Sequence, residues 1–343
     1  MKLKVGIAGY GIVGRRRRQY IDKNLNLETV AVCDQNFNNK EILDGIICYP
    51  NYRQLLEEEL DVLFVSLPNY LAPEVTIAGL EKGLHVFCEK PPGMNVGDVK
   101  KVLSIKQKYP SLKLKYGFNH RYHDSVKDAL KILRSKELGE VINLRAIYGK
   151  DGFVPFGSGW RAKREFAGGG ILLDQGIHMV DLIQLFCGDF LEVQSNVSND
   201  FWGCDVEDNV FAIMRNPEGR IAMLHSTATQ WQHLFSLSIF FTDGYLRLNG
   251  ILTGSKSYGQ ERLIIGRRTN LSTGSDREET ITYLEDNSWR DEINEFVDCI
   301  VNSRPIKSGT IEEALAAMKL VFRIYWADTI WRKKWKIPNP DRI

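Results

Sequence analysis

Three titratable residues interrupt a long apolar run near the middle of the chain. Between Ile171 and Phe186 the sequence is almost continuously apolar, and Asp174, His178 and Asp181 follow one another at spacings of four and three residues. This spacing places them on one face of a helix that is otherwise buried. A buried polar group without a partner costs about 1–3 kcal/mol, so this stripe needs partners or a function. One interpretation is a core histidine held by neighbouring carboxylates. The other is a site at which the imidazole, which titrates near neutral pH, transfers a proton.

A glycine-rich turn near the N-terminus indicates a second kind of chemistry. The segment Gly9-Tyr10-Gly11-Ile12-Val13-Gly14 has the spacing GxGxxG and stands between a strand-like run and a helical segment. In such a loop Gly9 permits the tight turn, Gly11 lets the backbone approach a pyrophosphate, and Gly14 lets the helix pack closely on the sheet. The start of the helix supplies N–H groups and the positive end of a dipole to the phosphates. The context predicts a dinucleotide-binding loop.

Asp34 bears on which dinucleotide is bound. It ends the second strand-like run, twenty residues beyond Gly14. A carboxylate at this place accepts hydrogen bonds from the adenosine ribose and repels a 2′-phosphate. The following Gln35-Asn36-Phe37 holds no basic residue, which favours NAD over NADP. The alternative interpretation of Asp34 is an aspartate that caps a turn or a helix. Because Arg15 and its neighbours begin the adjacent helix, NADP stays the alternative cofactor.

The elements that would carry these residues alternate between strand and helix. Short apolar runs occupy 5–8, 29–33, 62–67, 85–88 and 112–118, and segments with apolar residues at helical spacing occupy 14–23, 72–82 and 96–109. Runs that are apolar on both faces fit a parallel sheet covered by helices on each side. The first third of the chain is therefore predicted to be a doubly wound α/β domain.

Three further motifs occur in a fixed order along the chain. They are Val65-Ser66-Leu67-Pro68-Asn69, then Glu89-Lys90-Pro91, then Gly168-Gly169-Gly170-x-x-x-Asp174-x-Gly176-x-His178-x-x-Asp181. With the glycine loop, the chain resembles, over nearly its whole length, the glucose-fructose oxidoreductase, inositol dehydrogenase and rhizopine-catabolism family (Gfo/Idh/MocA). One departure is Ala72, at a place near a helix start where family members commonly carry a histidine. That position is outside the catalytic set, so the functional interpretation is unchanged.

The resemblance implies a fold in two parts. We expect an N-terminal NAD-binding Rossmann domain with a doubly wound parallel sheet in residues 1–120. A C-terminal α/β domain on a large, open, mainly antiparallel sheet, for substrate binding and oligomerisation, is expected in residues 121–343. Strand-like runs at 140–150, 209–216, 220–230 and 236–248, a turn at Thr242-Asp243-Gly244, and helical runs at 289–302 and 311–326 are compatible with it.

The resemblance also implies roles for individual residues. His178 is the candidate general base, Lys90 would hydrogen-bond the reacting hydroxyl at the nicotinamide edge, and Asp174 would orient the substrate through a neighbouring hydroxyl. Whether Lys90 or His178 takes the proton stays open. The implied cofactor-binding residues are Gly9, Tyr10, Gly11, Ile12, Val13, Gly14, Asp34, Ser66, Leu67, Pro68, Asn69, Glu89, Lys90 and Asn119. The implied substrate-binding residues are Lys90, Trp160, Arg161, Asp174 and His178, and no metal is expected.

Several further residues are weaker candidates. Arg121 could join the domains or serve the site, whereas a surface or packing role is expected for His120 and His123. Trp160-Arg161 could equally be packing residues. A strand or the loop after it could turn four more residues toward the pocket: His225, Gln230, Trp231 and His233.

Composition excludes several other classes. The 343 residues carry 45 Lys+Arg against 43 Asp+Glu, a formal net charge of +2, which excludes a strongly basic nucleic-acid binder. The run Arg15-Arg16-Arg17-Arg18 is expected to be a solvated helix face, with help in holding a phosphate as the alternative. The six cysteines contain no CxxC pair, and neither a signal peptide nor a membrane helix is read, so we expect a cytoplasmic protein.

Together these observations predict an NAD-dependent oxidoreductase that interconverts a ring hydroxyl and a ketone of a sugar or sugar nucleotide by hydride transfer. An inositol or polyol dehydrogenase, or a dinucleotide-binding sensor without turnover, are the alternatives. The expected partner is a carbohydrate, and the open sheet leads us to expect a homodimer or homotetramer. The sequence does not select the sugar, the ring carbon or the direction.

Overall fold

The chain folds into two compact units. The computed structural model describes residues 2–152, 159–254, 256–268 and 277–343. The first unit comprises Met1–Asn119, Glu165–Gly168 and Trp289–Leu315, and the second comprises His120–Arg164, Gly169–Ser288 and Ala316–Ile343. The predicted division into 1–120 and 121–343 differs in one respect, because two later segments return to the first unit.

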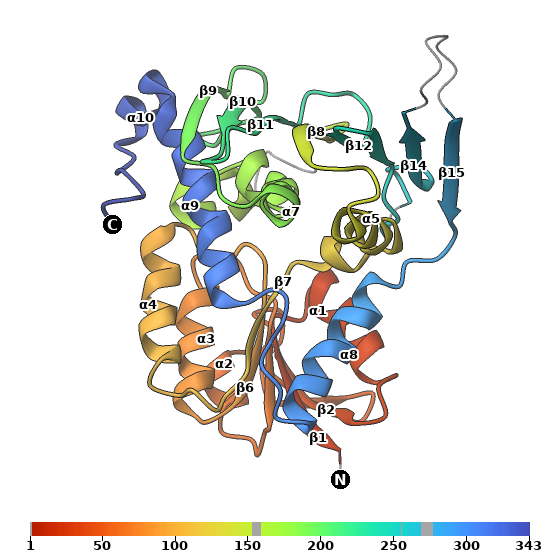
Figure 1. The fold of residues 1–343 in the computed structure, drawn as a ribbon. Helices are drawn as coiled ribbons and strands as arrows, with labels where there is room; N and C mark the ends of the chain where they lie inside the picture. The colour runs from red at the N-terminus through yellow and green to blue at the C-terminus, as the bar shows by residue number, and fades with distance from the viewer. Residues whose placement is uncertain (1, 153–158, 255, 269–276) are drawn as a thin grey trace. The chain divides into compact units, whose positions relative to one another are not determined.

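Within the described residues, the first unit carries a seven-stranded sheet with the order β3-β4-β2-β1-β5-β6-β7 (Figure 1). All neighbours are parallel except β3 and β4, which form an antiparallel pair at one edge. The strands are β1 (Leu3–Ala8), β2 (Leu27–Cys33), β3 (Glu41–Leu43), β4 (Ile46–Tyr49), β5 (Val62–Val65), β6 (His85–Glu89) and β7 (Leu114–Gly117). This confirms the predicted Rossmann-type parallel sheet.

Helices cover both faces of this sheet. They are α1 (Ile12–Ile21), α2 (Tyr52–Leu55), α3 (Ala72–Glu81), α4 (Val96–Lys106) and α8 (Ser288–Val301). Successive residues of β5 point to opposite faces. Phe64 stands edge-on to Phe296 of α8 at 6.0 Å between ring centres. Leu63 meets α3 on the other face, where a Cβ on Gly79 would lie 2.7 Å from it. Burial on both faces explains the continuous apolar runs.

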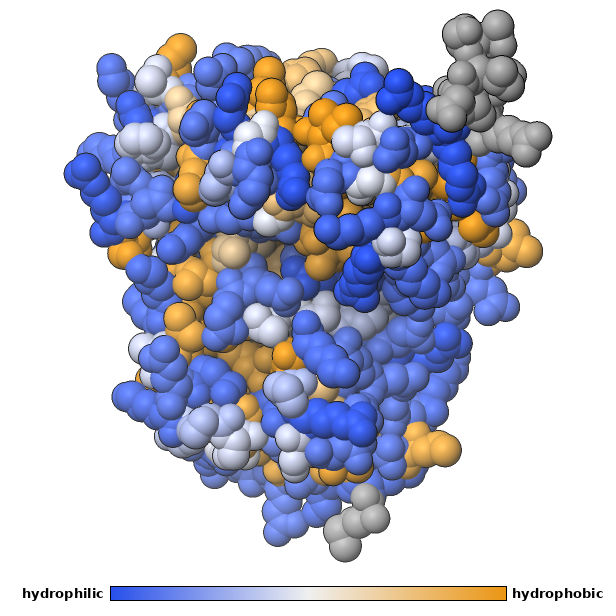
Figure 2. Space-filling model, viewed as in Figure 1, coloured by the Kyte–Doolittle hydropathy of each residue, from blue (hydrophilic) through white to orange (hydrophobic). Residues whose placement is uncertain are grey.

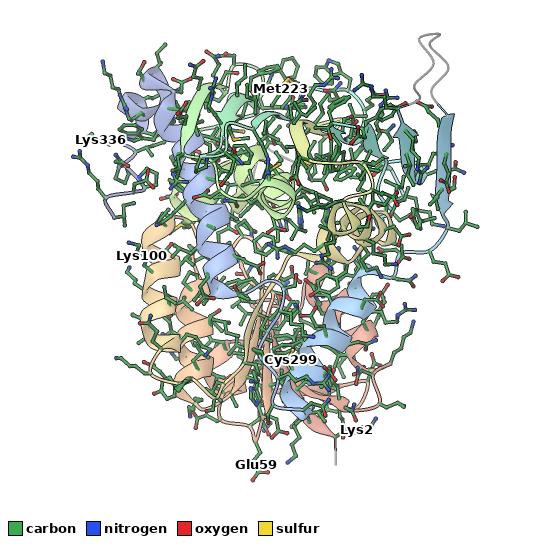
Figure 3. The ribbon with its side chains drawn as sticks, viewed as in Figure 1. Lys2, Glu59, Lys100, Met223, Cys299 and Lys336 are labelled. Atoms are coloured by element: carbon green, nitrogen blue, oxygen red, sulfur yellow. The ribbon has the colours of Figure 1, made fainter. Side chains whose placement is uncertain are left out.

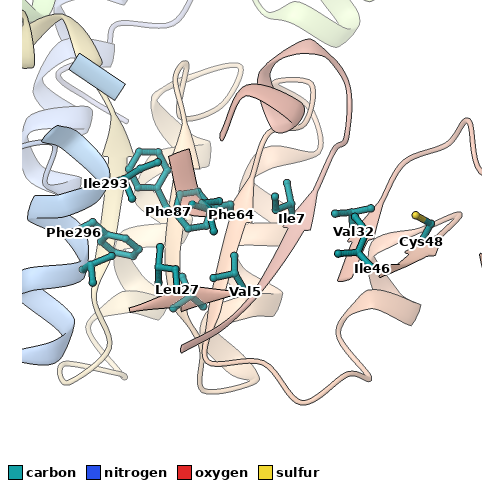
Figure 4. Close-up of a cluster of buried hydrophobic side chains, with 13 residues drawn as sticks. Val5, Ile7, Leu27, Val32, Ile46, Cys48, Phe64, Phe87, Ile293 and Phe296 are labelled. Carbon is teal, nitrogen blue, oxygen red and sulfur yellow. The ribbon is translucent and has the colours of Figure 1, made fainter. Parts of the chain in front are cut away.

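The face toward α8 explains why a C-terminal segment joins the first unit. Phe87 packs edge-on against Phe296 at 5.5 Å, and Ile293 and Val297 of α8 belong to the same buried cluster as Val5 (Figure 4). Cys299, labelled in Figure 3, is buried on the same helix. Removing α8 would expose this cluster, because burial of apolar area contributes about 25 cal/mol per Å².

Within the described residues, the second unit carries an eight-stranded sheet with the order β15-β14-β13-β12-β8-β11-β10-β9. All neighbouring strands are antiparallel except β8 and β11. The strands are β8 (Val141–Gly149), β9 (Glu192–Ser198), β10 (Asn209–Arg215), β11 (Ile221–Thr227), β12 (Leu234–Phe241), β13 (Gly244–Asn249), β14 (Glu261–Arg267) and β15 (Arg277–Tyr283). The predicted mainly antiparallel sheet is confirmed, and β12 turns into β13 at Thr242-Asp243 as expected.

Among the described residues, helices pack against one face of this sheet and leave the other open. The helices and turns of this part of the chain are η1 (Asn119–Tyr122), α5 (Asp124–Ser135), η2 (Trp160–Ala162), the π-helical turn η3 (Leu172–Gly176), α7 (Ile177–Cys187), α9 (Ile311–Ala327) and α10 (Thr329–Trp335). The short helix α6 (Arg164–Ala167) lies almost entirely in the first unit. In β10 the residues Val210, Ala212 and Met214 are buried, whereas Phe211 and Ile213 are exposed. Met223 of β11, labelled in Figure 3, is partly exposed, whereas its neighbours Ala222 and Leu224 are buried.

One helical stretch has the length and composition of a membrane span. It runs from Arg164 to Cys187, and 78% of its most apolar window is buried inside the folded chain. A core helix of a soluble protein has this character, so the stretch gives no support to a membrane span.

Candidate active site

The glycine loop connects β1 to α1. Gly9 has φ +90°, and a Cβ there would lie 2.3 Å from the carbonyl oxygen of Ser66. A Cβ on Gly14 would lie 2.0 Å from the carbonyl oxygen of Gly9, so both positions require glycine for packing inside the protein. A Cβ on Gly11 would meet no protein atom within 4 Å. The middle glycine therefore leaves the surface of the loop open, which suits the close approach of a dinucleotide.

Asp34 is tied to this loop. Its carboxylate accepts hydrogen bonds from the backbone N–H of Tyr10 at 2.9 Å and from the backbone N–H and side-chain amide of Asn36 at 3.0 and 2.7 Å. Arg15 lies with its guanidinium 5.6 Å from the ring centre of Tyr10, and Arg18 donates to the Tyr10 hydroxyl at 2.7 Å. The loop thus has a carboxylate at the strand end and two arginines on the helix side.

The residues predicted to bind the cofactor share one edge of the first sheet. The glycine loop, Asp34, Ser66–Asn69, Lys90 and Asn119 follow β1, β2, β5, β6 and β7, which are parallel neighbours. The carboxyl ends of parallel strands meet at one edge, where ligands of open α/β sheets bind. Asn69 also has a structural task, because its side-chain amide donates to the carbonyl of Ala167 at 2.8 Å.

Glu89, predicted to bind the cofactor, is held by a buried arginine. Arg17 is 0% exposed, and its guanidinium contacts Glu89 at 2.6 Å and Glu292 at 2.7 Å. It lies between the rings of Phe87 and Trp289, 4.4 and 4.2 Å from their centres. The expected solvated arginine face is therefore wrong at Arg17, because helix α1 turns this residue into the interior. Glu89 fixes the strand end that carries Lys90.

The three residues of the predicted polar stripe have different neighbours. Asp181 forms a buried ion pair with Arg121, whose Nε donates to Oδ2 at 2.7 Å. His178, only 4% exposed, stacks on His120 with ring centres 3.7 Å apart and planes 12° apart. Asp174 lies 3.9 Å from Lys150 Nζ and 3.6 Å from Arg161 Nε. Asp181 and Arg121 therefore form a structural pair, and Asp174 is the member of the stripe that lies among cations.

His120 contacts His178, which the sequence did not indicate. Besides stacking on His178, its Nε2 lies 2.9 Å from the Tyr148 hydroxyl, and Tyr148 packs against Tyr258 with ring centres 5.3 Å apart. Burial, with Tyr258 and Asp174 nearby, raises the pKa of Tyr148 well above its ordinary value. His123, by contrast, forms a buried pair with Glu261 at 2.7 Å. The only sequence signal was the position of both histidines in Asn119-His120-Arg121-Tyr122-His123.

The triple glycine is a packing device. A Cβ on Gly170 would lie 2.0 Å from the carbonyl oxygen of Glu207, and one on Gly169 would lie 2.4 Å from the Tyr325 hydroxyl. The Glu207 carboxylate accepts hydrogen bonds from the backbone N–H groups of Gly170 and Leu172 at 2.8 and 3.1 Å. Burial raises the pKa of this carboxyl, with Arg164 opposing the shift. Glu207 thereby fixes the start of the helix that carries Asp174.

The other predicted substrate residues lie beside Asp174. The Arg161 guanidinium stacks 4.4 Å from the centre of the Trp160 ring while its Nε faces Asp174. Of the weaker candidates, His225 stacks on Phe211 at 3.9 Å, and His233 contacts Asp151 at 3.3 Å. Across the described residues, no group of three or more His, Cys, Asp or Glu side chains is arranged around a common point where a metal could bind.

Two family models match the chain. Residues 3–116 match the model of an oxidoreductase family with an NAD-binding Rossmann fold, and residues 126–247 match a GFO/IDH/MocA C-terminal domain. The D-glucoside 3-dehydrogenase of Escherichia coli strain K12 is 32% identical over 205 residues, which are 58% of this chain and 58% of that protein. The match thus spans less than two thirds of the length of this curated relative.

Solved structures share the fold over more of the chain. A levoglucosan dehydrogenase in complex with NADH covers 96% of this chain and 98% of its own, with a TM-score of 0.84 at 18% identity. The myo-inositol 2-dehydrogenase from Lactobacillus plantarum covers the same shares, with a TM-score of 0.76 at 24% identity. With residues 3–116 and 126–247 matched and the glycine loop in place, this chain belongs to the GFO/IDH/MocA oxidoreductase family.

Proposed function

We propose that the chain is an NAD-dependent oxidoreductase that interconverts a ring hydroxyl and a ketone of a sugar or sugar nucleotide. The observation that carries the proposal is the position of Asp174 between Arg161 and Lys150, next to the stacked His178, on a helix start fixed by Glu207. A carboxylate and cations at one place suit a substrate with several neighbouring hydroxyls. The similar D-glucoside 3-dehydrogenase supports the substrate class.

The first unit fits a dinucleotide. Gly11 leaves the loop surface open, α1 is a ten-residue helix beginning at Ile12, and Asp34 stands at the adjacent strand end. The loop and the helix N-terminus would hold the pyrophosphate, and Asp34 the ribose. Since a carboxylate repels a 2′-phosphate, we propose NAD as the cofactor. When bound, it would accept or supply the hydride.

The proposed chemical roles concern proton handling and orientation. His178 acts as general base on the reacting hydroxyl, with its ring plane fixed by His120. Lys90 donates a hydrogen bond to the same oxygen and stabilises negative charge there. Asp174 accepts a hydrogen bond from a neighbouring hydroxyl. Whether Lys90 or His178 finally takes the proton is a question for the pH–rate profiles of the two variants.

The test is a panel of free sugars, glycosides and sugar nucleotides, with NADH formation followed at 340 nm. Lys90→Ala and His178→Ala should each lower kcat by about 10²-fold or more, while the NAD affinity of His178→Ala, measured by calorimetry, stays within a few-fold. Full activity in either variant would remove that residue from the mechanism. An inositol or polyol as the only substrate would favour the alternative dehydrogenase. NAD binding without turnover of any compound would favour a sensor.

We propose further that the chain forms a homodimer or homotetramer through the open face of the second sheet. Phe211 and Ile213 are 49% and 57% exposed on β10, and Ile221 of β11 is also exposed. Figure 2 shows apolar residues among the polar ones at the top of the view, where Figure 1 draws these strands. Exposed apolar residues gathered on one face mark an interaction surface. The six cysteines form no disulfide within the described residues, which agrees with a cytoplasmic, reducing location.

A further inference from the structure

Three aromatic side chains gather on the surface of the second unit. Phe201 stands edge-on to Trp202 and to Trp231, with ring centres 5.1 and 4.9 Å apart, and the two tryptophan rings are 6.2 Å apart. Phe201 is 58% and Trp231 60% exposed. Trp202 anchors the group, because its indole N–H donates to the carbonyl of Ala228 at 3.0 Å. We call these three residues the aromatic platform.

The platform lies beside the residues that hold Asp174. A Cβ on Gly152 would lie 3.3 Å from the Trp202 ring, and two residues earlier Lys150 faces Asp174 at 3.9 Å. The backbone carbonyl of Lys150 accepts a hydrogen bond from the N–H of Gln230 at 3.2 Å, and Gln230 directly precedes Trp231. The turn 150–152 therefore faces Asp174 through Lys150 and lies beside the aromatic platform at Gly152.

Folding alone gives no reason for Trp231 to stand there. Its ring is mostly in water, and its backbone has φ +58°, a left-handed conformation that bulky residues rarely adopt. An exposed aromatic ring does not gain the free energy that its burial would contribute. Residues in left-handed backbone conformations cluster at ligand-binding sites. The backbone conformation therefore keeps the Trp231 ring exposed beside the candidate substrate site at Asp174.

Local charge decides what the platform can bind. In the segment 200–208, which carries Phe201 and Trp202, Glu207 and Asp208 are buried. Asp200 and Asp205 are the acids that are not buried, Asp205 accepts a hydrogen bond from the N–H of Arg164 at 2.8 Å, and the segment holds no lysine or arginine. The segment 229–233 around Trp231 holds no charged residue other than its histidine, and that histidine faces Asp151. Neither segment supplies a lysine or arginine that could bind a phosphate or diphosphate. An uncharged ring with an apolar face fits this surface.

We propose that the aromatic platform is a subsite for a second, uncharged sugar ring, joined by a glycosidic bond to the ring that is oxidised beside Asp174. This inference rests on the proposed function and makes its substrate a glycoside or disaccharide. The C–H face of the second ring stacks on Trp231 and Phe201, and the first ring reaches Asp174 past the turn 150–152. A sugar nucleotide is disfavoured, because the segments 200–208 and 229–233 offer its diphosphate no lysine or arginine.

The experiment compares D-glucose, cellobiose and UDP-glucose as substrates of the full chain with NAD. The wild-type protein should use cellobiose with a kcat/KM at least tenfold above that of glucose. Trp231→Ala should lower kcat/KM for cellobiose about tenfold or more, through KM, and leave the value for glucose within twofold. Trp326→Ala, a tryptophan of α9 stacked by Arg332 at 4.3 Å, is the matched control and should change neither.

Several outcomes would overturn the subsite. They are an equal loss for glucose and cellobiose in Trp231→Ala, a preference for UDP-glucose that depends on Trp231, and a change of oligomeric state in Trp231→Ala without a change of preference. Calorimetry with non-reacting methyl β-cellobioside separates this proposal from the proposed function. Binding that weakens about tenfold in Trp231→Ala would support the platform even if no sugar were oxidised. Binding unchanged in that variant, or no binding at all, would overturn it.

Discussion

The buried Arg17 makes the end of β6 a rigid point in the first unit. Its guanidinium is shared by Glu89 and Glu292 and enclosed by Phe87 and Trp289. Removing one member of a buried ion pair leaves an uncompensated charge, which costs about 3–5 kcal/mol. Because Glu89 directly precedes Lys90, the same network that stabilises the unit also fixes the strand end next to Lys90.

The pH dependence of stability reports on this network. Burial raises the pKa of Glu292 to about 7, with Arg17 and Lys115 opposing the shift, whereas an unfolded glutamate titrates near ~4.3. A folded pKa above the unfolded one adds stability that is complete below pH ~4.3 and is lost as the pH rises to about 7. Glu292→Gln removes this titration. The variant should therefore lose less stability than the wild type between pH 5 and pH 8, measured by urea unfolding. Equal losses would show that Glu292 titrates in the ordinary range.

We expect His120 to position His178. Parallel rings 3.7 Å apart leave His178 little freedom to tilt, and a displacement of about 1 Å at a catalytic group can cost about 10²-fold in rate. His120→Ala should lower kcat about 10- to 100-fold with little change in KM, whereas His120→Phe should restore most of the activity because it keeps a flat ring. If His120→Phe is as slow as His120→Ala, the contact with Tyr148 and not the stacking is what matters.

At the scale of elements, helix α1 combines packing and binding in its first turns. Gly14 contacts the loop closely enough that a Cβ would fall 2.0 Å from a carbonyl oxygen, whereas a Cβ on Gly11 would be in open space. Gly14→Ala should therefore destabilise the protein by about 1–3 kcal/mol. Gly11→Ala should leave stability within about 0.5 kcal/mol and weaken NAD binding at least tenfold.

Thermal unfolding and calorimetric titration with NAD separate these two effects. Unchanged NAD affinity in Gly11→Ala would show that no cofactor approaches the loop at this residue. The pair is informative because each variant adds a single methyl group three residues from the other.

Elements differ in how well the sequence reveals them. Strands β1, β2, β5 and β6 are buried on both faces and were predicted from continuous apolar runs. Strand β3 is short and fully exposed, and β9 (Glu192–Ser198) is largely polar, so neither carries such a signal. Helix α5 was overlooked although Val126, Ala129 and Leu130 mark an apolar face.

The candidate active site was also predicted only in part. Spacing along the chain placed Asp174 and His178 on one helix, but their partners lie far away in sequence. Arg17 and Glu89 are 72 residues apart and His120 precedes His178 by 58, and side-chain pairs at such distances leave no periodic trace. Residues that act locally were predictable, and residues that position them were not.

At the scale of the whole molecule, the near-neutral charge of +2 allows copies of the chain to associate without strong repulsion. The open face of the second sheet presents Phe211, Ile213 and Ile221 to solvent. A lysine in the middle of an apolar interface places a charge where water is excluded, which costs several kcal/mol per subunit. Ile213→Lys should therefore shift the proposed dimer or tetramer toward monomer in light scattering at micromolar concentration.

Ile42→Lys is the control for this prediction, because Ile42 is 74% exposed on β3 of the first unit. It should leave the oligomer unchanged. A wild-type protein that is monomeric at micromolar concentration would contradict the proposed assembly, and so would equal dissociation in the two variants. Because the two lysines add the same charge to exposed strand positions, a difference between them measures the sheet face itself and not the change in net charge.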